Sequence, residues 1–469
     1  MKILVAIANH GTKNRGFLDR LLAEYRSMPW QLHIVVLSDA PKTDLGEDVE
    51  VLVGAPSEDP WSLPFAHRKL FVERQEDYDL FIYSEDDTLL TERNLRSWVE
   101  IQPLLADDQI LGFLRFETYR NGELSYCGVH YHYHWNPETV TAIGGETFAH
   151  FTNEHSALSV LNRKQLKACI AFGEYDVPAH QGRYDMLVSA ASDPYTQCGL
   201  QRLICTSRLD DLLLCHLPNV YLDRIGVKAR DFLPQIETLA EIAAGRASGE
   251  QLFDPKVSLY VPREDWNKVY YPEPIPEYRG SVEFGARRIL SIGCGAGAVE
   301  ADWISLGATV TAIPMDAIIG ATAALHSIEI LPPNLDKAIA QIEDRLFDIV
   351  VFHNCLEHVA EPVEWIKKAM QCLANKGQVV ILAPSQLGRR LRFRARKEKY
   401  PFAERPSFAD AKYHYTTPRI VRGWLQEAGL DPKKTHFVLR GKAARVAVMA
   451  KGFLDAILAN AFIQIGRKR

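Results

Sequence analysis

The sequence has few cysteines: eight scattered residues in 469 positions, with no Cys-x-x-Cys pair. This spacing excludes a dense disulfide framework and is typical of a protein whose thiols stay reduced. No stretch reaches the ~18 apolar residues of a membrane span, because the nearest candidate, GFLDAILANAFIQI, is shorter and contains Asp455. The opening residues, MKILVAIANHG, turn polar too early for a signal peptide. We therefore expect a cytoplasmic protein.

Charge and length narrow the class further. The net charge of −5 argues against a general nucleic-acid binder, and the length predicts more than one domain. Strand-like runs such as KILVAIAN and QLHIVVLSD flank a helical stretch, and the same alternation restarts at RRILSIGCGAG. A polar, proline-containing segment separates the two halves. The sequence predicts an α/β protein with domains at 1–228 and 281–469 and a linker at 229–280.

Three carboxylates follow a predicted buried strand in the stretch DLFIYSEDDTLL, residues 79–90. Parallel sheets bind ligands at the carboxyl ends of their strands, where Glu85, Asp86 and Asp87 would lie. On an extended segment Glu85 and Asp87 point the same way, and Mg²⁺ combines carboxylates with substrate phosphates. The alternative is an acidic turn in solvent.

With this motif and the helical stretch before it, the N-terminal half resembles a GT-A type glycosyltransferase. The resemblance implies a GT-A (Rossmann-like) fold, a nucleotide-sugar donor and a divalent cation, Mn²⁺ or Mg²⁺. It assigns the metal to Glu85, Asp87 and His216. It assigns donor contacts to Asn9, Asp39, either Arg68 or Lys69, Glu85 and Asp86.

The same resemblance implies a late carboxylate that deprotonates the acceptor hydroxyl in an inverting enzyme. The stretch GRYDMLVSAASDPYTQCGL offers Asp185, with Asp193 further on. An acid at a helix N-terminus also occurs simply because it interacts favourably with the helix dipole. Inverting and retaining mechanisms both stay open.

A histidine triplet, His130, His132 and His134, alternates along CGVHYHYHW. The three rings would share one face of a strand but spread over ~13 Å, too far to bind a single ion. We interpret the triplet as part of an aromatic surface strand.

The second half contains a glycine loop at Gly293, Gly295 and Gly297, between a predicted strand and a predicted helix. Glycines there let the backbone turn tightly against a ligand at a helix N-terminus. The loop alone fits either a dinucleotide or S-adenosylmethionine (SAM).

The later segment FDIVVFHNCLEHVAEP, with LEHV after its strand, resembles class I SAM-dependent methyltransferases over 281–469. The nearest branch is that of small-molecule, sugar or quinone O-methyltransferases. The resemblance implies SAM as cofactor and His358 as a base for the acceptor proton, with helix capping or packing as the alternative role. It assigns SAM contacts to Gly293, Cys294, Gly295, Gly297, Asp316, Asn354 and Leu356.

One departure concerns the acid that this family places at the end of the second strand. The stretch VTAIPMD puts Pro314 at that position and Asp316 two residues later. Proline lacks an N–H, so we expect the chain to leave the sheet there and turn Asp316 toward the ribose.

Together the two resemblances predict a bifunctional enzyme of bacterial polysaccharide or glycolipid synthesis. Glycosyl transfer to a glycan or lipid-linked glycan would precede or follow O-methylation of a sugar hydroxyl. The alternative is a methyltransferase whose N-terminal domain only binds glycan. The basic stretch GRRLRFRARKEKY, 388–400, is either a solvated helix face or a contact for an anionic acceptor or membrane surface.

Overall fold

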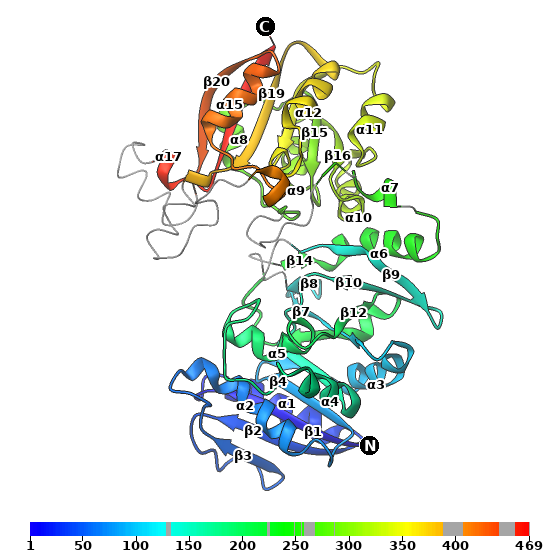
Figure 1. The fold of residues 1–469 in the computed structure, drawn as a ribbon, viewed down its shortest axis with the longest axis vertical. Helices are drawn as coiled ribbons and strands as arrows, with labels where there is room; N and C mark the ends of the chain where they lie inside the picture. Colours follow the sequence, from blue (N-terminus) through cyan, green and yellow to red (C-terminus); the bar gives the residue numbers. More distant parts are fainter. Residues whose placement is uncertain are drawn as a thin grey trace. The chain divides into compact units, whose positions relative to one another are not determined.

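The computed structural model describes residues 1–127, 133–222, 226–247, 249–254, 256–257, 268–285, 287–387, 407–439 and 455–468 (Figure 1). Contacts divide the chain into two compact units. The N-terminal unit takes in most of residues 1–230, and the C-terminal unit takes in most of 231–469.

The N-terminal unit is built on a five-stranded sheet in the order β11-β4-β1-β2-β3. Four strands are parallel and β11 pairs antiparallel with β4. Because β1 is apolar along almost its whole length, it is buried in the centre of the sheet. The strands are β1 (Lys2–Asn9), β2 (Gln31–Ser38), β3 (Val49–Val53), β4 (Leu80–Glu85) and β11 (Leu158–Asn162).

The register brings the carboxyl ends of three parallel strands to one edge. Asn9 pairs with Ser38 on β2, and Ala8 pairs with Glu85 on β4. The strand order reverses between β1 and β4, so this edge contains the topological switch point where α/β sheets bind ligands.

Helices accompany this sheet. The buried residues of α1 follow a helical period, since Leu18, Leu21, Leu22 and Tyr25 share one face. The side chains of Thr91 and Asn162 cap α3 and α4 in capping boxes. The helices are α1 (Arg15–Ser27), the 3₁₀ helix η1 (Pro60–Phe65), α2 (Ala66–Glu73), α3 (Glu92–Ile101), η2 (Gln102–Leu104), α4 (Arg163–Phe172), α5 (Met186–Thr196) and η3 (Thr206–Leu212).

Two smaller sheets complete the N-terminal unit. One has the order β6-β12-β10-β9, with β6 (Gln109–Leu111), β12 (Gln201–Cys205), β10 (Glu146–Phe151) and β9 (Trp135–Ile143). The other has the order β14-β8-β7-β13-β5, with β14 (Gly226–Lys228), β8 (Leu124–Cys127), β7 (Leu114–Thr118), β13 (Leu213–His216) and β5 (Thr88–Leu89).

The C-terminal unit contains a seven-stranded sheet in the order β17-β16-β15-β18-β19-β21-β20 (Figure 1). Its first five strands are parallel and β21 runs antiparallel to both neighbours. The order reverses between β15 and β18, as in Rossmann-like folds. The strands are β15 (Arg288–Cys294), β16 (Thr309–Pro314), β17 (Glu329–Ile330), β18 (Phe347–His353), β19 (Leu373–Pro384), β20 (Leu430–Val438) and β21 (Ala461–Lys468).

Short helices connect these strands. They are α9 (Ala298–Ser305), α10 (Ala317–Gly320), η5 (Ala321–His326), α11 (Leu335–Gln341), η6 (Leu356–His358), α12 (Pro362–Ala369), η7 (Met370–Cys372), α14 (Phe408–Ala411), α15 (Pro418–Glu427) and α17 (Asp455–Leu458). No helix among the described residues is long and apolar enough to cross a membrane.

The predicted linker, 229–280, is more structured than its composition indicates. It contains α6 (Ala229–Ala243), α7 (Gly249–Leu252) and the start of α8 (Pro276–Ser281). Tyr270 and Tyr278 are buried in the core of the C-terminal unit, where Tyr278 packs edge-on against Trp303 with 5.3 Å between ring centroids. Prolines in this segment therefore shape a packed extension of the core.

Candidate functional site

The glycine loop follows β15 at the switch point of the seven-stranded sheet. Gly293 has φ +87°, and a Cβ there would lie 2.7 Å from Cys355 Cβ. Gly297 has φ +90°, and its Cβ would lie 2.8 Å from Ala323 Cα. Both positions need glycine because the backbone is left-handed and the neighbouring chain is close.

The middle glycine is constrained by the chain itself. A Cβ on Gly295 would lie 1.8 Å from the carbonyl oxygen of Tyr270, and that oxygen accepts a hydrogen bond from the N–H of Ala296 at 2.8 Å. The side chain of Cys294 is buried in the core, so only its backbone is available to a ligand. The segment before β15 thus packs directly on the loop.

Asp316 lies in the turn between β16 and α10. Pro314 is still paired in the sheet, so the chain leaves β16 only after it. One carboxylate oxygen, Oδ1, accepts the N–H groups of Ile318 and Ile319 at 2.8 and 3.2 Å. The other, Oδ2, is buried and has no hydrogen-bond donor among the described residues. Burial raises the pKa of Asp316 to about 7.

Asn354 presents a second buried oxygen of this kind. It follows β18 with a left-handed φ of +44°, held by its own N–H, which donates to Leu382 O at 3.0 Å. Its side-chain Oδ1 has no donor within the described part of the chain. Buried acceptors are normally satisfied, and the described residues leave both this oxygen and Asp316 Oδ2 without a donor. Leu356, beyond it, is buried in the core.

Lys268 is a buried cation that the sequence patterns did not indicate. Its Nζ donates to the carbonyl oxygen of His353, the last residue of β18, at 2.6 Å. Burial lowers the pKa of the Lys268 ammonium and holds the pKa of the His353 imidazole well below its usual range. A lone lysine in a polar segment carries no pattern that would single it out.

His358 and Glu357 are both buried. The ring of His358 meets that of Tyr413 edge-on, with 5.2 Å between centroids, and Tyr413 Oη accepts a hydrogen bond from Gln386. The backbone oxygen of Glu357 accepts the N–H of His414 at 2.8 Å. The His358 ring therefore lies against an aromatic neighbour in the segment that follows β18.

In the N-terminal unit, Asp86 joins two strands at the switch point. Its Oδ2 accepts Asn9 Nδ2 at 2.5 Å, and its Oδ1 accepts Asn14 Nδ2 at 2.7 Å. Burial raises the pKa of Asp86 to about 6, against the effect of the two amides. Both oxygens are therefore engaged in holding the loop after β1 to the end of β4.

Asp87 faces a buried histidine. The Oδ2 atom of Asp87 lies 3.7 Å from Nε2 of His216, and Nδ1 of His216 donates to Glu117 Oε1 at 2.6 Å. The other carboxylate oxygen of Glu117 accepts the N–H of Tyr221 at 2.9 Å, and the Tyr221 ring stacks on His216. Glu117 fixes the imidazole so that Nε2 points at Asp87. No motif had singled out Glu117.

Glu85 lies beside the charges of Asp87, Arg115 and Asp185. Burial and the repulsion of Asp87 raise the pKa of Glu85 to about 8, while Arg115 acts in the opposite direction. Asp185 caps α5 by accepting the N–H of Val188 at 3.0 Å and is exposed. The structure thus brings Asp185 within electrostatic reach of the acidic motif while using one of its oxygens as a helix cap.

The remaining predicted donor contacts, Asp39 and either Arg68 or Lys69, differ in their surroundings. Asp39 follows β2 and accepts the N–H of Gly11 at 2.8 Å, which lowers the pKa of Asp39. Arg68, in contrast, is only 1% exposed and pairs with the buried Asp193 at 2.6 Å. The Lys69 side chain is 80% exposed and pairs with Glu73 on the same helix. The guanidinium of Arg68 is thus held by a buried carboxylate, and both oxygens of Asp193 are engaged. The donor contact at Arg68 or Lys69 stays a prediction.

Two predicted features lie wholly or partly outside the described residues. They are the basic stretch 388–400 and, in the histidine triplet, His130 and His132. His134 is buried, and its backbone N–H donates to Thr152 Oγ1 at 3.0 Å. Within the described ranges, no group of three or more His, Cys, Asp or Glu side chains is placed to hold a metal ion.

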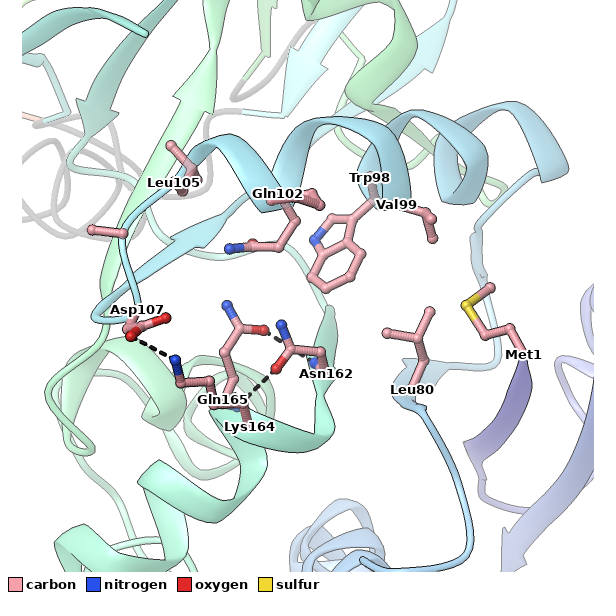
Figure 2. Close-up of a pocket in the computed structure, with 12 residues that line it drawn as sticks. Met1, Leu80, Trp98, Val99, Gln102, Leu105, Asp107, Asn162, Lys164 and Gln165 are labelled. Atoms are coloured by element: carbon pink, nitrogen blue, oxygen red, sulfur yellow. Dashed lines mark hydrogen bonds and ion pairs between the residues drawn. The ribbon is translucent and has the colours of Figure 1, made fainter. Parts of the chain in front are cut away.

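A pocket of about 310 Å³ opens in the N-terminal unit at the opposite edge of its sheet, near Met1 and Leu80 at the amino ends of β1 and β4. Figure 2 shows Trp98 and Gln102 on one side and the Asp107–Lys164 ion pair, 2.6 Å, on the other. Gln102 is bonded to the backbone of residues 109 and 111. A second pocket of about 290 Å³ lies at the amino ends of β15, β16 and β18. Neither coincides with the clusters above.

The chain was compared with known proteins. A family model described as "Methyltransferase domain" matches residues 254–434. The ubiquinone biosynthesis O-methyltransferase of Xanthomonas euvesicatoria pv. vesicatoria is 26% identical over 156 residues, which span 32% of this chain and 65% of that protein. The enzyme of the same name from Pseudomonas fluorescens is 26% identical over 200 residues, or 41% of this chain and 84% of that protein.

Two solved structures to which the chain is similar are named as methyltransferases. One is an S-adenosylmethionine-dependent methyltransferase from Mesorhizobium loti, with 17% identity and a TM-score of 0.31, covering 41% of this chain and 96% of that one. Another is the N-methyltransferase NodS from Bradyrhizobium japonicum in complex with S-adenosyl-L-homocysteine, with 15% identity and a TM-score of 0.29, covering 41% and 86%.

The Rossmann-like sheet and the family match together define the C-terminal part of the protein. Residues 254–434 form a class I methyltransferase domain that uses SAM as its cofactor. The domain begins before residue 281, the boundary expected from the sequence, so it includes Lys268 and Tyr270.

Proposed function

We propose that the C-terminal unit transfers a methyl group from SAM to a hydroxyl group of a sugar. The observation that carries the proposal is the pair of buried, donor-free oxygens, Asp316 Oδ2 and Asn354 Oδ1, beside the glycine loop. The curated relatives are named O-methyltransferases, which supports a hydroxyl acceptor. When bound, SAM supplies an electrophilic methyl group for attack by the acceptor oxygen.

The chain's own residues position the cofactor and move the proton. The backbone from Gly293 through Cys294, Gly295 and Gly297 would border the methionine and ribose parts, and Leu356 would form the apolar wall. The unpartnered oxygen of Asp316 would accept a ribose hydroxyl, and Asn354 Oδ1 would accept a second donor. His358 takes the acceptor proton, because a neutral imidazole is a competent base near neutral pH.

The His358 assignment is tested by comparing His358→Asn with Tyr413→Leu. Both substitutions disturb the same aromatic contact, but only the first removes the base. We expect SAM affinity to persist in both variants and methyl transfer to a sugar acceptor to fall by about a hundredfold or more in His358→Asn alone. Equal rates in the two variants would assign His358 to packing.

For the N-terminal unit we propose a metal-dependent nucleotide-sugar site that transfers the sugar to a glycan or lipid-linked glycan. The supporting observation is the set of polar side chains gathered at the carboxyl edge of the parallel sheet, where Asn9, Asp39 and the acidic motif meet. Asp87 and His216 are the pair that would hold Mn²⁺ or Mg²⁺, with diphosphate oxygens completing the coordination; Glu85, the third predicted ligand, is not grouped with them in the described structure. The Glu117–His216 bond supports this role, since metal-binding histidines commonly donate their other N–H to a carboxylate.

Asp185 is the proposed base for the acceptor hydroxyl. It is exposed, its charge reaches Glu85, and only one of its oxygens is engaged as a helix cap. The two activities on one chain suit successive steps on one bacterial surface glycan, because tethering raises the effective concentration of the second site.

The alternative is a methyltransferase whose N-terminal unit binds glycan without catalysis. Binding should first be measured by thermal shift with nucleotide sugars, Mn²⁺ and SAM, since ligands that bind the folded state raise its stability. Hydrolysis of a nucleotide sugar that requires Mn²⁺, is stimulated by glycan and is lost in Asp87→Ala would support catalysis. Glycan binding without any nucleotide-sugar response would support the alternative.

A further inference from the structure

Three arginines among the described residues of the N-terminal unit are almost fully buried: Arg68, Arg115 and Arg202. Two of them have acceptors for their terminal nitrogens. Arg68 bonds the carboxylate of Asp193 and the backbone oxygens of Tyr175 and Ser189. Arg202 bonds backbone oxygens, among them that of Asn153 at 3.2 Å.

Arg115 differs from both. It is 4% exposed, and although Nε lacks a hydrogen-bond partner among the described residues in all three arginines, only in Arg115 does a buried terminal nitrogen, Nη2, lack one as well. Leaving charged donors without acceptors in a buried position costs several kcal/mol, which folded proteins normally avoid. The unpartnered Nη2 of Arg115 therefore indicates an acceptor that the described part of the chain does not supply.

The position of Arg115 on β7 places its N–H groups at the proposed nucleotide-sugar site. Arg115 lies on β7 and pairs in register with Leu214 on β13. Two residues further along the same face, Glu117 bonds His216, which faces Asp87.

The charges around Arg115 bear on the kind of ligand. Glu85, Asp87 and Asp185 are carboxylates that would repel an anionic ligand, so a diphosphate needs fixed positive charge in addition to any cation. A guanidinium presents its N–H groups in a planar fork that matches two oxygens of a phosphate.

We propose that Arg115 binds phosphate oxygens of the nucleoside diphosphate moiety in the N-terminal site. The inference rests on the proposed function of this unit and adds a residue that recognises the diphosphate directly. It requires no particular base or sugar, so it can be tested before the natural donor is known.

The test compares the wild-type chain with Arg115→Met, an uncharged side chain of similar length. Affinities for inorganic pyrophosphate, UDP and GDP are measured by calorimetry with Mn²⁺ present. We expect Arg115→Met to bind these probes roughly ten- to a hundredfold more weakly, the equivalent of losing a charged hydrogen bond. Arg115→Lys should recover only part of the affinity, because it keeps the charge but not the fork.

Two controls separate binding from folding. Arg202→Met also removes a buried guanidinium, but one bonded to backbone oxygens, so it should lower the melting temperature without selectively weakening the diphosphates. SAM affinity should stay unchanged in every variant. If wild-type binds a diphosphate and Arg115→Met binds it equally well, the Arg115 inference is overturned while the proposed function stands.

Two further outcomes would also overturn the assignment of Arg115 to phosphate oxygens. If the wild-type chain binds neither pyrophosphate nor any nucleoside diphosphate, the proposed function of the N-terminal unit fails, and the assignment of Arg115 fails with it. If the loss in Arg115→Met is confined to UDP-glucuronate and spares UDP, Arg115 recognises a sugar carboxylate, and the phosphate assignment is overturned.

Discussion

Nδ1 of His216 donates to Oε1 of Glu117 at 2.6 Å, inside the N-terminal unit and on neighbouring strands. The bond fixes which imidazole nitrogen carries hydrogen and leaves Nε2 facing Asp87. A buried carboxylate that orients a histidine in this way is typical of a ligand-binding imidazole.

This relationship gives the first prediction. Glu117→Gln keeps the shape of the side chain but offers an amide where the imidazole N–H needs a strong acceptor. We expect Mn²⁺ affinity, measured by calorimetry with a nucleoside diphosphate present, to fall by roughly ten- to a hundredfold. Glu123→Gln, in the turn before β8 and paired with Lys228, is the matched control and should change little. Unchanged Mn²⁺ affinity in Glu117→Gln would remove the case for His216 as a ligand.

The second prediction concerns the acidic motif. Asp87→Ala should abolish Mn²⁺-dependent sugar transfer and leave SAM affinity and methyl transfer unchanged, because the methyltransferase residues belong to the other unit. Asp86→Ala should instead lower the melting temperature, since both Asp86 oxygens hold amide side chains. Transfer that survives both Asp87→Ala and a chelator would contradict the metal site.

The third prediction uses Asp316, whose buried carboxyl group has a pKa of about 7. Asp316→Asn keeps an acceptor for the N–H groups of Ile318 and Ile319 but removes the charge. A carboxylate that accepts a ribose hydroxyl contributes ~1.5–3 kcal/mol, so SAM should bind roughly ten- to a hundredfold more weakly. Calorimetry showing less than about a twofold change would assign the ribose contact elsewhere.

The same residue predicts a pH dependence of stability. Because the folded-state pKa lies above the unfolded value, ionisation favours the unfolded chain, and the ligand-free protein loses stability as pH rises from about 4 to 7. The penalty is fully present above pH 7 and absent below the unfolded pKa. A shift of about three pKa units corresponds to at most about 4 kcal/mol. Denaturant unfolding of Asp316→Asn should therefore show a shallower pH dependence, whereas SAM affinity of the wild type should rise as Asp316 ionises.

The fourth prediction concerns the glycine loop. In Gly295→Val a branched side chain would stand where the backbone approaches the cofactor, which by itself predicts lost SAM binding with the fold retained. The closeness of Tyr270 O changes that expectation, because a Cβ at 1.8 Å must displace the segment before β15. We now expect Gly295→Val to lose both SAM affinity and stability of the C-terminal unit. Gly423→Ala, where a Cβ meets nothing within 4 Å, is the matched control.

The fifth prediction separates Arg68 from Lys69. Arg68→Met leaves the Asp193 carboxylate buried without its guanidinium partner and should lower the free energy of unfolding by ~3–5 kcal/mol. Lys69→Ala removes an exposed ion pair and should change it by less than about 1 kcal/mol. If Lys69→Ala binds a nucleotide sugar more weakly than the wild type does, the predicted donor contact at Lys69 is supported.

The sequence by itself determined the periodic parts of the protein. Runs of apolar residues such as β1 and β15, alternating with helical stretches, indicated parallel strands in both halves. The glycine loop and the LEHV segment pointed to SAM, and the family match at 254–434 confirms the methyltransferase domain. These signals are local: they depend on spacing along the chain, which is visible without coordinates.

Only the tertiary structure decided which buried polar side chains have hydrogen-bond partners among the described residues. Arg68 and Arg115 look alike in sequence, but only Arg68 meets a buried carboxylate. Glu117 and Lys268 carry no motif, because their neighbours, His216 and His353, are 99 and 85 residues away along the chain. Hydrogen-bond satisfaction in a buried site depends on side chains converging from different strands, and that convergence is a property of the fold and not of any local pattern.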